Sequence, residues 1–283
     1  MTKASTGLRE QLLTDGFCLF PRVLDPAMIE ELTGVTDQLL AQQTPEEREQ
    51  VRYQGSSIFI AYQHPVFARL FTRPEALNAL DTLGFPDPKW ASAFLLSKPP
   101  HAPPLYWHQD WWAWDDPVSA AVIPPQVFLM YYLTDTTPAN GCLRVIPGTH
   151  RRRIPLHDQL PAAHEPAAQA AGLDSSLFTR HPDEVDIPAQ AGDLVIGDAR
   201  LLHAAHANQT DTRRTCLTLW YLPDYAELPD SIKAYAGRKK PLAPPDWWEP
   251  EVGKPVERLI PWYSGSAAPA AWNRAPGEFL RRE

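Results

Sequence analysis

Short apolar segments separated by turn residues dominate the middle of this sequence. Residues 90–97, 126–133 and 214–221 each have the length and composition of a strand, and the third alternates between its two faces. The 31 prolines among 283 residues favour loops and strand edges over long helices. A chain of this kind is expected to close its strands into a barrel or a sandwich.

The first third of the sequence favours helices. Residues 7–42 carry apolar side chains at helical spacing, and Asp25 and Pro26 supply an N-cap and a first-turn proline for a second helix. Residues 75–83 form another short amphipathic helix. We therefore predict one α+β domain over residues 1–283, made of N-terminal helices (about 7–85), a β core (about 88–222) and a C-terminal segment rich in proline and aromatic residues (223–283).

Three further stretches complete the expected organisation. Asn140-Gly141 predicts a hairpin turn that leads into a strand at residues 142–146, and residues 192–198 form a turn and a short strand. The polar, alanine-rich stretch 157–184 has the composition of an insertion, and residues 223–283 are expected to be mostly irregular.

Charge and cysteine content argue against several classes of protein. The 26 basic and 34 acidic residues give a net charge of -8, which disfavours nucleic acid or an anionic membrane as the main partner. Three well-separated cysteines indicate neither a disulfide framework nor a cysteine zinc site. No run approaches the ~18 apolar residues of a spanning helix, and the N-terminal residues lack an apolar signal core, so a cytoplasmic protein is expected.

Two histidines and an aspartate form a candidate metal site. His108 and Asp110 project from the same face of a strand, since residues i and i+2 share a face. A third ligand is available in His203, which follows the strand that begins at Leu194 and can neighbour the first strand in a barrel. This ligand set is typical of mononuclear non-haem iron oxygenases and leaves positions open for a bidentate 2-oxo acid and dioxygen. By itself, His-x-Asp also fits a hydrogen-bonded pair without a metal.

Arg214, eleven residues after His203, indicates what else binds at this metal. The charges of ferrous iron, the Asp110 carboxylate, 2-oxoglutarate and Arg214 cancel, whereas without the arginine a distal carboxylate would be buried unpaired at high cost. A guanidinium also binds a carboxylate through two parallel hydrogen bonds, which lysine cannot do. The His-x10-Arg spacing therefore favours 2-oxoglutarate as the co-substrate.

These residues belong to a set of motifs that resembles the phytanoyl-CoA dioxygenase family of Fe(II)/2-oxoglutarate oxygenases. The Pro-Gly-Thr-His segment is a specific signature of this kind. The matching stretches run from residue 15 to about residue 221 and comprise Asp15-Gly16-Phe17, Val23-Leu24-Asp25-Pro26, Trp107-His108-Gln109-Asp110, Asn140 to Pro147-Gly148-Thr149-His150, Gly192-Asp193 to His203, Asn208 and Arg213-Arg214.

The resemblance implies a double-stranded β-helix, a cupin-like jelly-roll of eight core strands with helices packed outside. It implies His108, Asp110 and His203 as iron ligands and Arg214 as the partner of the C5 carboxylate of 2-oxoglutarate. Arg213 competes for that role, because strand alternation lets only one of the two arginines face inward. The spacing favours Arg214.

Two positions depart from the family pattern. Ala205 stands where the family often has a hydroxyl residue that helps hold the C5 carboxylate. The chain then either lacks one hydrogen bond to this group or supplies it from Thr134, Thr136 or a tryptophan. His206 replaces a usually small residue and is a rival metal ligand, but it would break the spacing to the arginine, so the earlier histidine is favoured.

Aromatic residues surround the expected metal site. The resemblance implies that Trp114, four residues after the aspartate, lines the co-substrate pocket. Trp111 and Trp112 alternate in direction, so at most one faces the metal, while Tyr106 shares the face of the first histidine. We assign these three residues and Tyr132 to the substrate pocket, with ordinary packing at the barrel mouth as the alternative.

Other candidate residues lie outside the ligand set. Lys98 is a candidate contact for the anionic co-substrate, although lysines at strand ends are usually solvated. Arg144 and the run 151–153 form a basic stretch that would suit a phosphate- or CoA-bearing substrate, with a solvated turn as the alternative. Trp247-Trp248 and Trp262 form either a lid or a segment packed on the barrel.

We predict an Fe(II)/2-oxoglutarate-dependent dioxygenase, a monomer or homodimer, that hydroxylates an unactivated C–H bond of a small organic molecule and releases succinate and CO2. Asp110 disfavours halogenation, because a halogenase replaces this carboxylate with a small residue, but desaturation, epoxidation and ring closure remain open. A cupin-like metal-binding or sensing protein is the second hypothesis, which Arg214 disfavours. A zinc hydrolase is the third, with Glu165 and Asp198 as its candidate bases.

Overall fold

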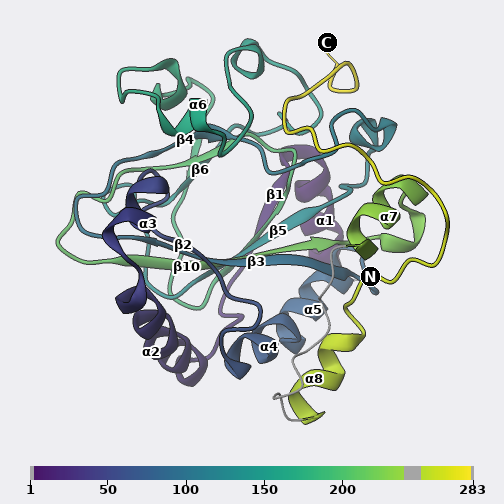
Figure 1. Cartoon of the computed structure of the whole chain (residues 1–283), viewed down its shortest axis with the longest axis horizontal. Helices are drawn as coiled ribbons and strands as arrows, with labels where there is room; N and C mark the ends of the chain where they lie inside the picture. Colours follow the sequence, from purple (N-terminus) through teal and green to yellow (C-terminus); the bar gives the residue numbers. More distant parts are fainter. Residues whose placement is uncertain (1–2, 239–249, 282–283) are drawn as a thin grey trace.

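The computed structural model describes residues 3–238 and 250–281, so Trp247 and Trp248 of the expected lid lie outside the described residues. Two antiparallel sheets form its centre (Figure 1). The larger sheet has the order β1 (Phe17–Phe20), β8 (Leu194–Asp198), β5 (Val127–Tyr132), β10 (Arg214–Leu222), β3 (Lys89–Lys98) and β2 (Ser57–Phe59). The smaller sheet has the order β4 (Leu105–His108), β9 (His203–Ala205), β6 (Leu143–Val145) and β7 (Val185–Ile187).

The eight strands from β3 to β10 divide equally between the two sheets. Along the chain these strands alternate between the two sheets, as in a double-stranded β-helix, except that β6 and β7 follow one another in the smaller sheet and are joined by the long segment 146–184. The predicted jelly-roll core is therefore confirmed. In the described part of the chain, no helix is both long and apolar enough to cross a membrane.

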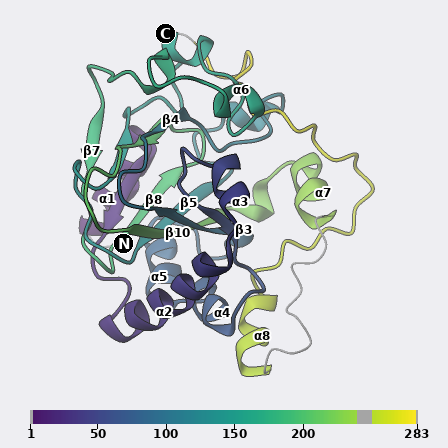
Figure 2. The same ribbon diagram turned by 60° about the vertical axis from the view of Figure 1, so that its left-hand side comes forward.

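Helices cover the outer face of the larger sheet, and α2, α4 and α5 lie together on that side in both views (Figures 1 and 2). Prolines begin most of them, because a proline at the first helical position loses no intrahelical hydrogen bond. The predicted N-cap Asp25 accepts a hydrogen bond from the Met28 backbone N–H. The helices are α1 (Lys3–Asp15), α2 (Pro26–Gln42), α3 (Pro45–Gln50), α4 (Pro65–Phe71), α5 (Pro74–Thr82), α6 (Pro166–Gln169), α7 (Asp230–Arg238) and α8 (Pro250–Glu257), with 3-10 turns η1 (Pro117–Ala120), η2 (Pro155–Asp158), η3 (Ser176–Phe178) and η4 (Tyr225–Glu227).

The larger sheet has two different faces, and β10 shows both. Leu217 and Leu219 point outward into the hydrophobic core under the helices. Arg214, Cys216 and Thr218, which alternate with them, point inward and line a cavity. The alternation seen in the sequence thus separates core residues from cavity residues.

Two sequence expectations about the elements are wrong. Within the stretch 7–42 that was expected to be helical, Phe17–Phe20 form strand β1, because Gly16, with φ of +91°, ends α1, whereas the second helix begins at Pro26 as expected. Asn140-Gly141 is not a hairpin, since β5 and β6 on either side of it belong to different sheets. The segment after residue 222 contains α7 and α8 among its described residues and is otherwise mostly irregular, as expected.

Candidate metal centre

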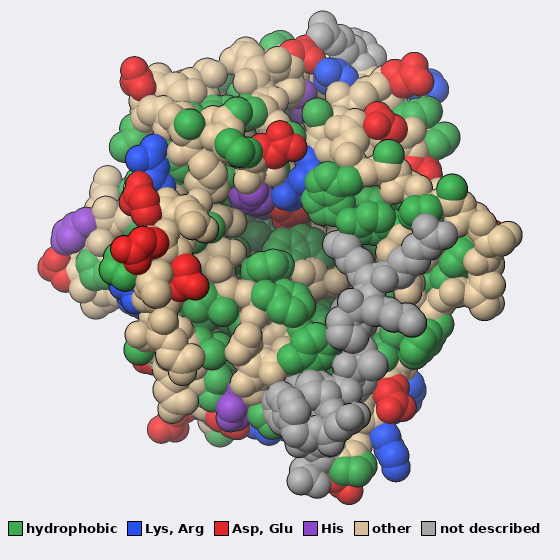
Figure 3. All heavy atoms as spheres, viewed as in Figure 1, with side chains coloured by type: hydrophobic (Ala, Val, Ile, Leu, Met, Phe, Trp, Pro, Cys, Tyr) green, Lys and Arg blue, Asp and Glu red, His purple; other side chains and the backbone are tan. Residues whose placement is uncertain are grey.

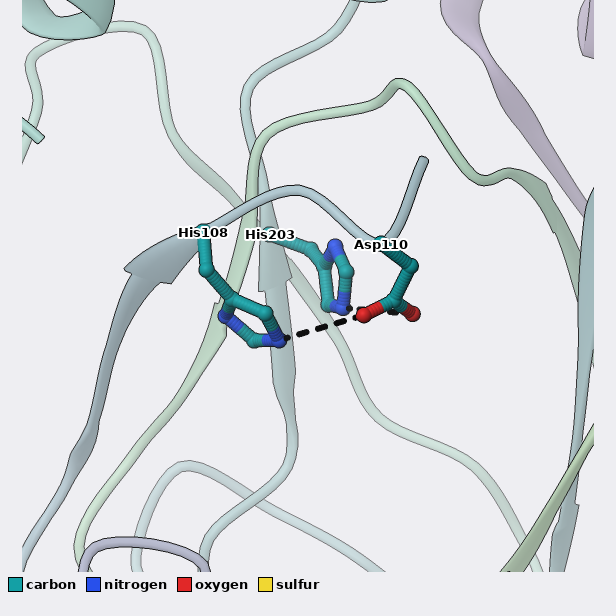
Figure 4. A group of neighbouring side chains, drawn as sticks. All are labelled: His108, Asp110 and His203. Atoms are coloured by element: carbon teal, nitrogen blue, oxygen red, sulfur yellow. Dashed lines mark ion pairs between the residues drawn. The ribbon is translucent and has the colours of Figure 1, made fainter. Parts of the chain in front are cut away.

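His108, Asp110 and His203 converge on one point between the sheets (Figure 4). His108 ends β4 and lies directly opposite His203, the first residue of β9. This neighbour differs from the expected one, because the strand that begins at Leu194 pairs with β1 and β5 instead. Asp110 lies two residues beyond β4, where its backbone N–H donates to the carbonyl of Ala199 at 2.8 Å.

Backbone carbonyls fix the protonation of both imidazoles. Nδ1 of His108 lies 3.0 Å from the carbonyl oxygen of Tyr106, and Nδ1 of His203 lies 3.0 Å from that of Leu201. A carbonyl oxygen only accepts hydrogen bonds, so Nδ1 carries the proton and the Nε2 lone pair faces Asp110. Burial, reinforced by the neighbouring His203, holds the pKa of His108 well below its ordinary value, which favours the neutral imidazole that binds metals.

The separations of these donor atoms fit a single metal ion. Nε2 of His108 lies 3.7 Å from Oδ1 of Asp110, and Nε2 of His203 lies 3.6 Å from Oδ2. Two donors that each bind one ion at about 2.1 Å can lie at most about 4.2 Å apart. Two imidazoles and one carboxylate suit a transition metal such as iron and leave further coordination positions open.

Two residues that the sequence analysis did not assign hold the Asp110 carboxylate. The indole N–H of Trp220 donates to Oδ2 at 3.0 Å, and the Arg274 guanidinium lies 3.3 Å from Oδ1. A signal for Trp220 existed, since it shares its strand face with Arg214. Arg274 comes from the C-terminal segment, more than 160 residues after its partner, and no local pattern marks it.

Arg214 and Lys98 form a cationic pair near the metal ligands, directly opposite each other in β10 and β3. The Arg214 guanidinium is buried, donates to Sγ of Cys216 at 3.1 Å, and has an Nε without a hydrogen-bond partner. Lys98 is also buried, and its amine donates to the backbone carbonyls of Tyr53 and Pro103. Burial, and then the charge of Arg214, lowers the pKa of Lys98 well below its ordinary value.

Neither cation has a carboxylate partner within ion-pair distance in residues 3–238 and 250–281. Arg213, the rival of Arg214, points to the other face of β10, where it is half-buried and donates to Ser97 Oγ at 3.2 Å. The pair therefore has the charge and the unused donor of an anion-binding site.

A cavity of about 470 Å³ connects these groups. Figure 3 shows a hollow near the middle of this face, with hydrophobic side chains along much of its rim and cationic and histidine side chains at its upper edge. The volume lies within the ~300–1,000 Å³ typical of small-molecule sites. The residues from the sequence analysis that line it are His108, Asp110, His203, Arg214, Lys98, Trp112, Tyr132 and Ala205.

Trp111, Trp114 and Tyr106 are not among the lining residues, which corrects their expected place in the pocket. Trp111 and Trp114 are fully buried in the hydrophobic cluster behind Trp112, where the Trp111 indole donates to Ser119 Oγ at 2.8 Å. The Tyr106 hydroxyl instead lies 2.8 Å from Nδ1 of His164. His164 does line the cavity, although no sequence motif marks it.

The remaining candidates lie elsewhere. His206 is 2.6 Å from Asp186 and belongs to a separate group with that aspartate and Cys142. Thr136 bonds the backbone of Ala189 and, like Thr134, is not a lining residue.

Residues of the basic stretch form ion pairs with carboxylates, and the two candidate bases do not line the cavity. Arg144 pairs with Glu184, and Arg153 pairs with Asp158. Asp198 pairs with Arg200 at 2.6 Å, and Glu165 is exposed, so neither base expected for a hydrolase faces the cavity.

Comparison with known proteins agrees with this geometry. The model of the phytanoyl-CoA dioxygenase (PhyH) family matches residues 12–216, more than half of the chain. An ectoine dioxygenase of Nocardia farcinica is 24% identical over 229 residues, which cover 74% of this chain and 76% of that protein.

Solved structures show the same fold. The 2-oxoglutarate-dependent epimerase SnoN from nogalamycin biosynthesis superposes with a TM-score of 0.57 at 22% identity, covering 78% of this chain and 84% of that one. HygX of Streptomyces hygroscopicus, with nickel and 2-oxoglutarate bound, superposes with a TM-score of 0.56 at 19% identity, and the match covers 79% of this chain and 87% of HygX. The chain belongs to the phytanoyl-CoA dioxygenase family and is a 2-oxoglutarate-dependent non-haem iron dioxygenase.

Proposed function

We propose that this protein hydroxylates an unactivated C–H bond of a small organic molecule, with iron held by His108, Asp110 and His203. Ferrous iron, when bound there, supplies the activation of dioxygen that is coupled to decarboxylation of 2-oxoglutarate to succinate and CO2. The observation that supports this most directly is Arg214, a buried guanidinium with an unused Nε in the same cavity as the three ligands. A protein that only stores or senses a metal needs no such group.

Lys98 and Arg214 together bind the C5 carboxylate of 2-oxoglutarate in this proposal. The two side chains face each other across paired strands, and both line the cavity. Lys98 thereby supplies the hydrogen bond that the family's hydroxyl residue would give, since Ala205 cannot donate one. A bound carboxylate also stabilises the ammonium form of Lys98, which burial otherwise disfavours.

Halogenation is disfavoured by the protein groups around the ligands. Asp110 keeps both of its oxygens engaged by Trp220 and Arg274, so the position is filled by a held carboxylate and leaves no space for a halide. Desaturation, epoxidation and ring closure use the same site, and SnoN, with this fold, is an epimerase. Product analysis therefore decides between them.

An anaerobic titration tests the proposal. Ferrous iron and 2-oxoglutarate added together should give a visible charge-transfer band, and the absence of this band would contradict the proposed co-substrate. Arg214→Ala removes the charged donor and should weaken 2-oxoglutarate binding by about 10–100-fold, as expected for one charge-assisted hydrogen bond worth about 1.5–3 kcal/mol. Arg213→Ala, one residue away on the opposite strand face, should leave the titration unchanged.

A further inference from the structure

One wall of the cavity comes from residues that follow the family region. The family model ends at residue 216, whereas Tyr235 on α7 and Trp272 and Arg274 beyond α8 all line the cavity. The ligands and Arg214 lie within the family region. The metal ligands and Arg214 are therefore separate along the chain from these three residues, which meet Trp112 of the family region on one side of the cavity.

The wall is fixed in place by hydrogen bonds to the loop that follows Asp110. The backbone N–H of Asn273 donates to the carbonyl of Trp112 at 2.7 Å, and the Asn273 side chain donates to Asp115 at 2.8 Å. Ala270 is bonded to α7 through the Ser231 carbonyl at 3.0 Å. Figures 1 and 2 show this C-terminal segment passing α7 along the side of the core.

Trp112, Tyr235 and Trp272, which we call the aromatic wall, have nearly parallel rings. The Trp112 and Tyr235 ring centroids are 3.9 Å apart at an interplanar angle of 30°. Trp272 is 5.7 Å from Trp112 at 10° and 5.9 Å from Tyr235 at 29°. The three rings therefore form one stack, with the Arg274 guanidinium over the Trp272 ring at 5.8 Å from its centroid. Rings that enclose a cation stand around it on several sides, whereas a stack of parallel rings can be extended by a flat ring system on the cavity side.

Charge also limits what fits against this wall. Asp110 is the one acidic side chain among the described lining residues, and it already contacts Arg274, so a cationic substrate would meet a guanidinium without a free carboxylate. Of the other lining cations, Lys98 ends β3 and Arg214 starts β10, whereas Leu222, which packs with Trp112, lies at the opposite end of β10. Among the described lining residues, no second pair of lysine or arginine side chains stands beside the wall for a phosphate-rich substrate such as an acyl-CoA.

We propose that the substrate is a neutral, flat, conjugated ring system that stacks on the aromatic wall and accepts a hydrogen bond from Arg274. The buried Nε of Arg274 has no partner and is available for a carbonyl or hydroxyl oxygen. This identification rests on the proposed function for the site. It places the oxidised C–H bond at the edge of a ring that the wall holds beside the metal ligands.

Binding of matched probes tests the substrate class. The protein loaded with Fe(II) and 2-oxoglutarate under anaerobic conditions is titrated with 2-naphthol, with its saturated analogue decahydro-2-naphthol, and with the charged analogues 2-naphthoate and 2-naphthylmethylammonium. 2-Naphthol should bind at least about tenfold more tightly than the other three. Equal binding of the saturated probe, or tighter binding of either charged probe, would overturn the proposal.

Variants locate the bound probe. Trp272→Leu and Tyr235→Leu should each weaken 2-naphthol binding by about two- to tenfold, the value of one aromatic contact. Trp262→Leu is the matched control, because Trp262 lies in the same segment, is 70% exposed and does not line the cavity. Equal losses in all three variants would place the probe elsewhere. The charge-transfer band, recorded on each sample, separates failure of this inference, where the band persists, from failure of the proposed function, where it is absent.

Discussion

At the scale of single residues, the candidate site depends on side chains that orient the ligands as well as on the ligands. Both histidines donate through Nδ1 to a carbonyl two residues earlier in the chain, so strand geometry itself sets their tautomers. The Asp110 carboxylate is held by Trp220 and Arg274. The first arrangement is local and the second joins distant parts of the chain.

Trp220→Phe removes the hydrogen bond to Oδ2 of Asp110 and keeps a large aromatic side chain. The affinity for Fe(II), measured by competition with a chelator, should fall by about 10–100-fold, as is usual when a residue that orients a metal ligand is lost. Trp112→Phe alters another tryptophan of the cavity whose indole makes no hydrogen bond to Asp110. If both variants bind Fe(II) as tightly as the parent, Trp220 does not position the ligand.

At the scale of elements, alternation in β3, β5 and β10 is the main organising feature. One face of each strand joins the core under the helices, and the other lines the cavity or packs towards the smaller sheet. Short elements outside the sheets also bury polar side chains.

The 3-10 turn η2 is an example, because its residue His157 is buried and its Nδ1 accepts a hydrogen bond from the Ile154 backbone N–H at 3.0 Å.

Burial lowers the pKa of His157 to about 4, which makes the stability of the protein depend on pH. As the pH falls, His157 in the unfolded chain, with a pKa near 6.5, takes up a proton before His157 in the folded chain does. The contribution of this group to the free energy of unfolding is therefore full above pH ~6.5 and is lost as the pH falls towards 4. At about 1.36 kcal/mol per pKa unit, the free energy of unfolding falls by about 3 kcal/mol.

Urea unfolding at several pH values checks this effect. His157→Asn keeps a side-chain acceptor for the Ile154 N–H but does not titrate, so the parent should lose about 3 kcal/mol relative to the variant between pH 7 and pH 4. His101→Asn changes an exposed histidine and should follow the parent. Parallel curves for the parent and the His157 variant would contradict the buried neutral imidazole.

At the scale of the whole molecule, the site closes only where three distant regions meet. His108 ends β4 and Asp110 lies just beyond it, while His203 and Arg214 come from β9 and β10. The C-terminal segment adds Arg274. Ligands that bind across such a meeting point stabilise the folded state, because the unfolded chain cannot bind them.

The unfolding temperature should therefore rise in two steps when Fe(II) and then 2-oxoglutarate are added. Fe(II) raises the unfolding temperature first, and 2-oxoglutarate at about 100 times its dissociation constant adds about 2.7 kcal/mol, or roughly 5–10 °C for a chain of this size. Arg214→Ala should keep the first step and lose most of the second. An equal loss of both steps would mean that Arg214 supports the metal site as a whole rather than the co-substrate.

The parts of the site that depend on local spacing could be predicted from the sequence alone. His-x-Asp, the later histidine and the His-x10-Arg distance predicted the three residues that converge and favoured the arginine that faces inward. Asp110 lies two residues beyond β4 and is placed by the hydrogen bond from its backbone N–H to Ala199. Arg214 faces inward because side-chain direction in a strand repeats every two residues. The same periodicity could not separate β1 from α1, where Phe17 and Leu19 fit both patterns and one glycine made the difference.

Only the tertiary structure decided which residues complete the site. Trp114, Trp111 and Tyr106 lie near the ligands in sequence yet pack away from the cavity, whereas His164 and Arg274 are remote in sequence and line it. Loops and the C-terminal segment have no period that fixes where a side chain points. Their side chains are placed by hydrogen bonds such as that from Asn273 to Trp112, which exist once the chain has folded. The reaction class could thus be predicted from spacing, while Trp112 was the one residue of the aromatic wall that the sequence placed in the pocket, because Tyr235 and Trp272 come from the C-terminal segment.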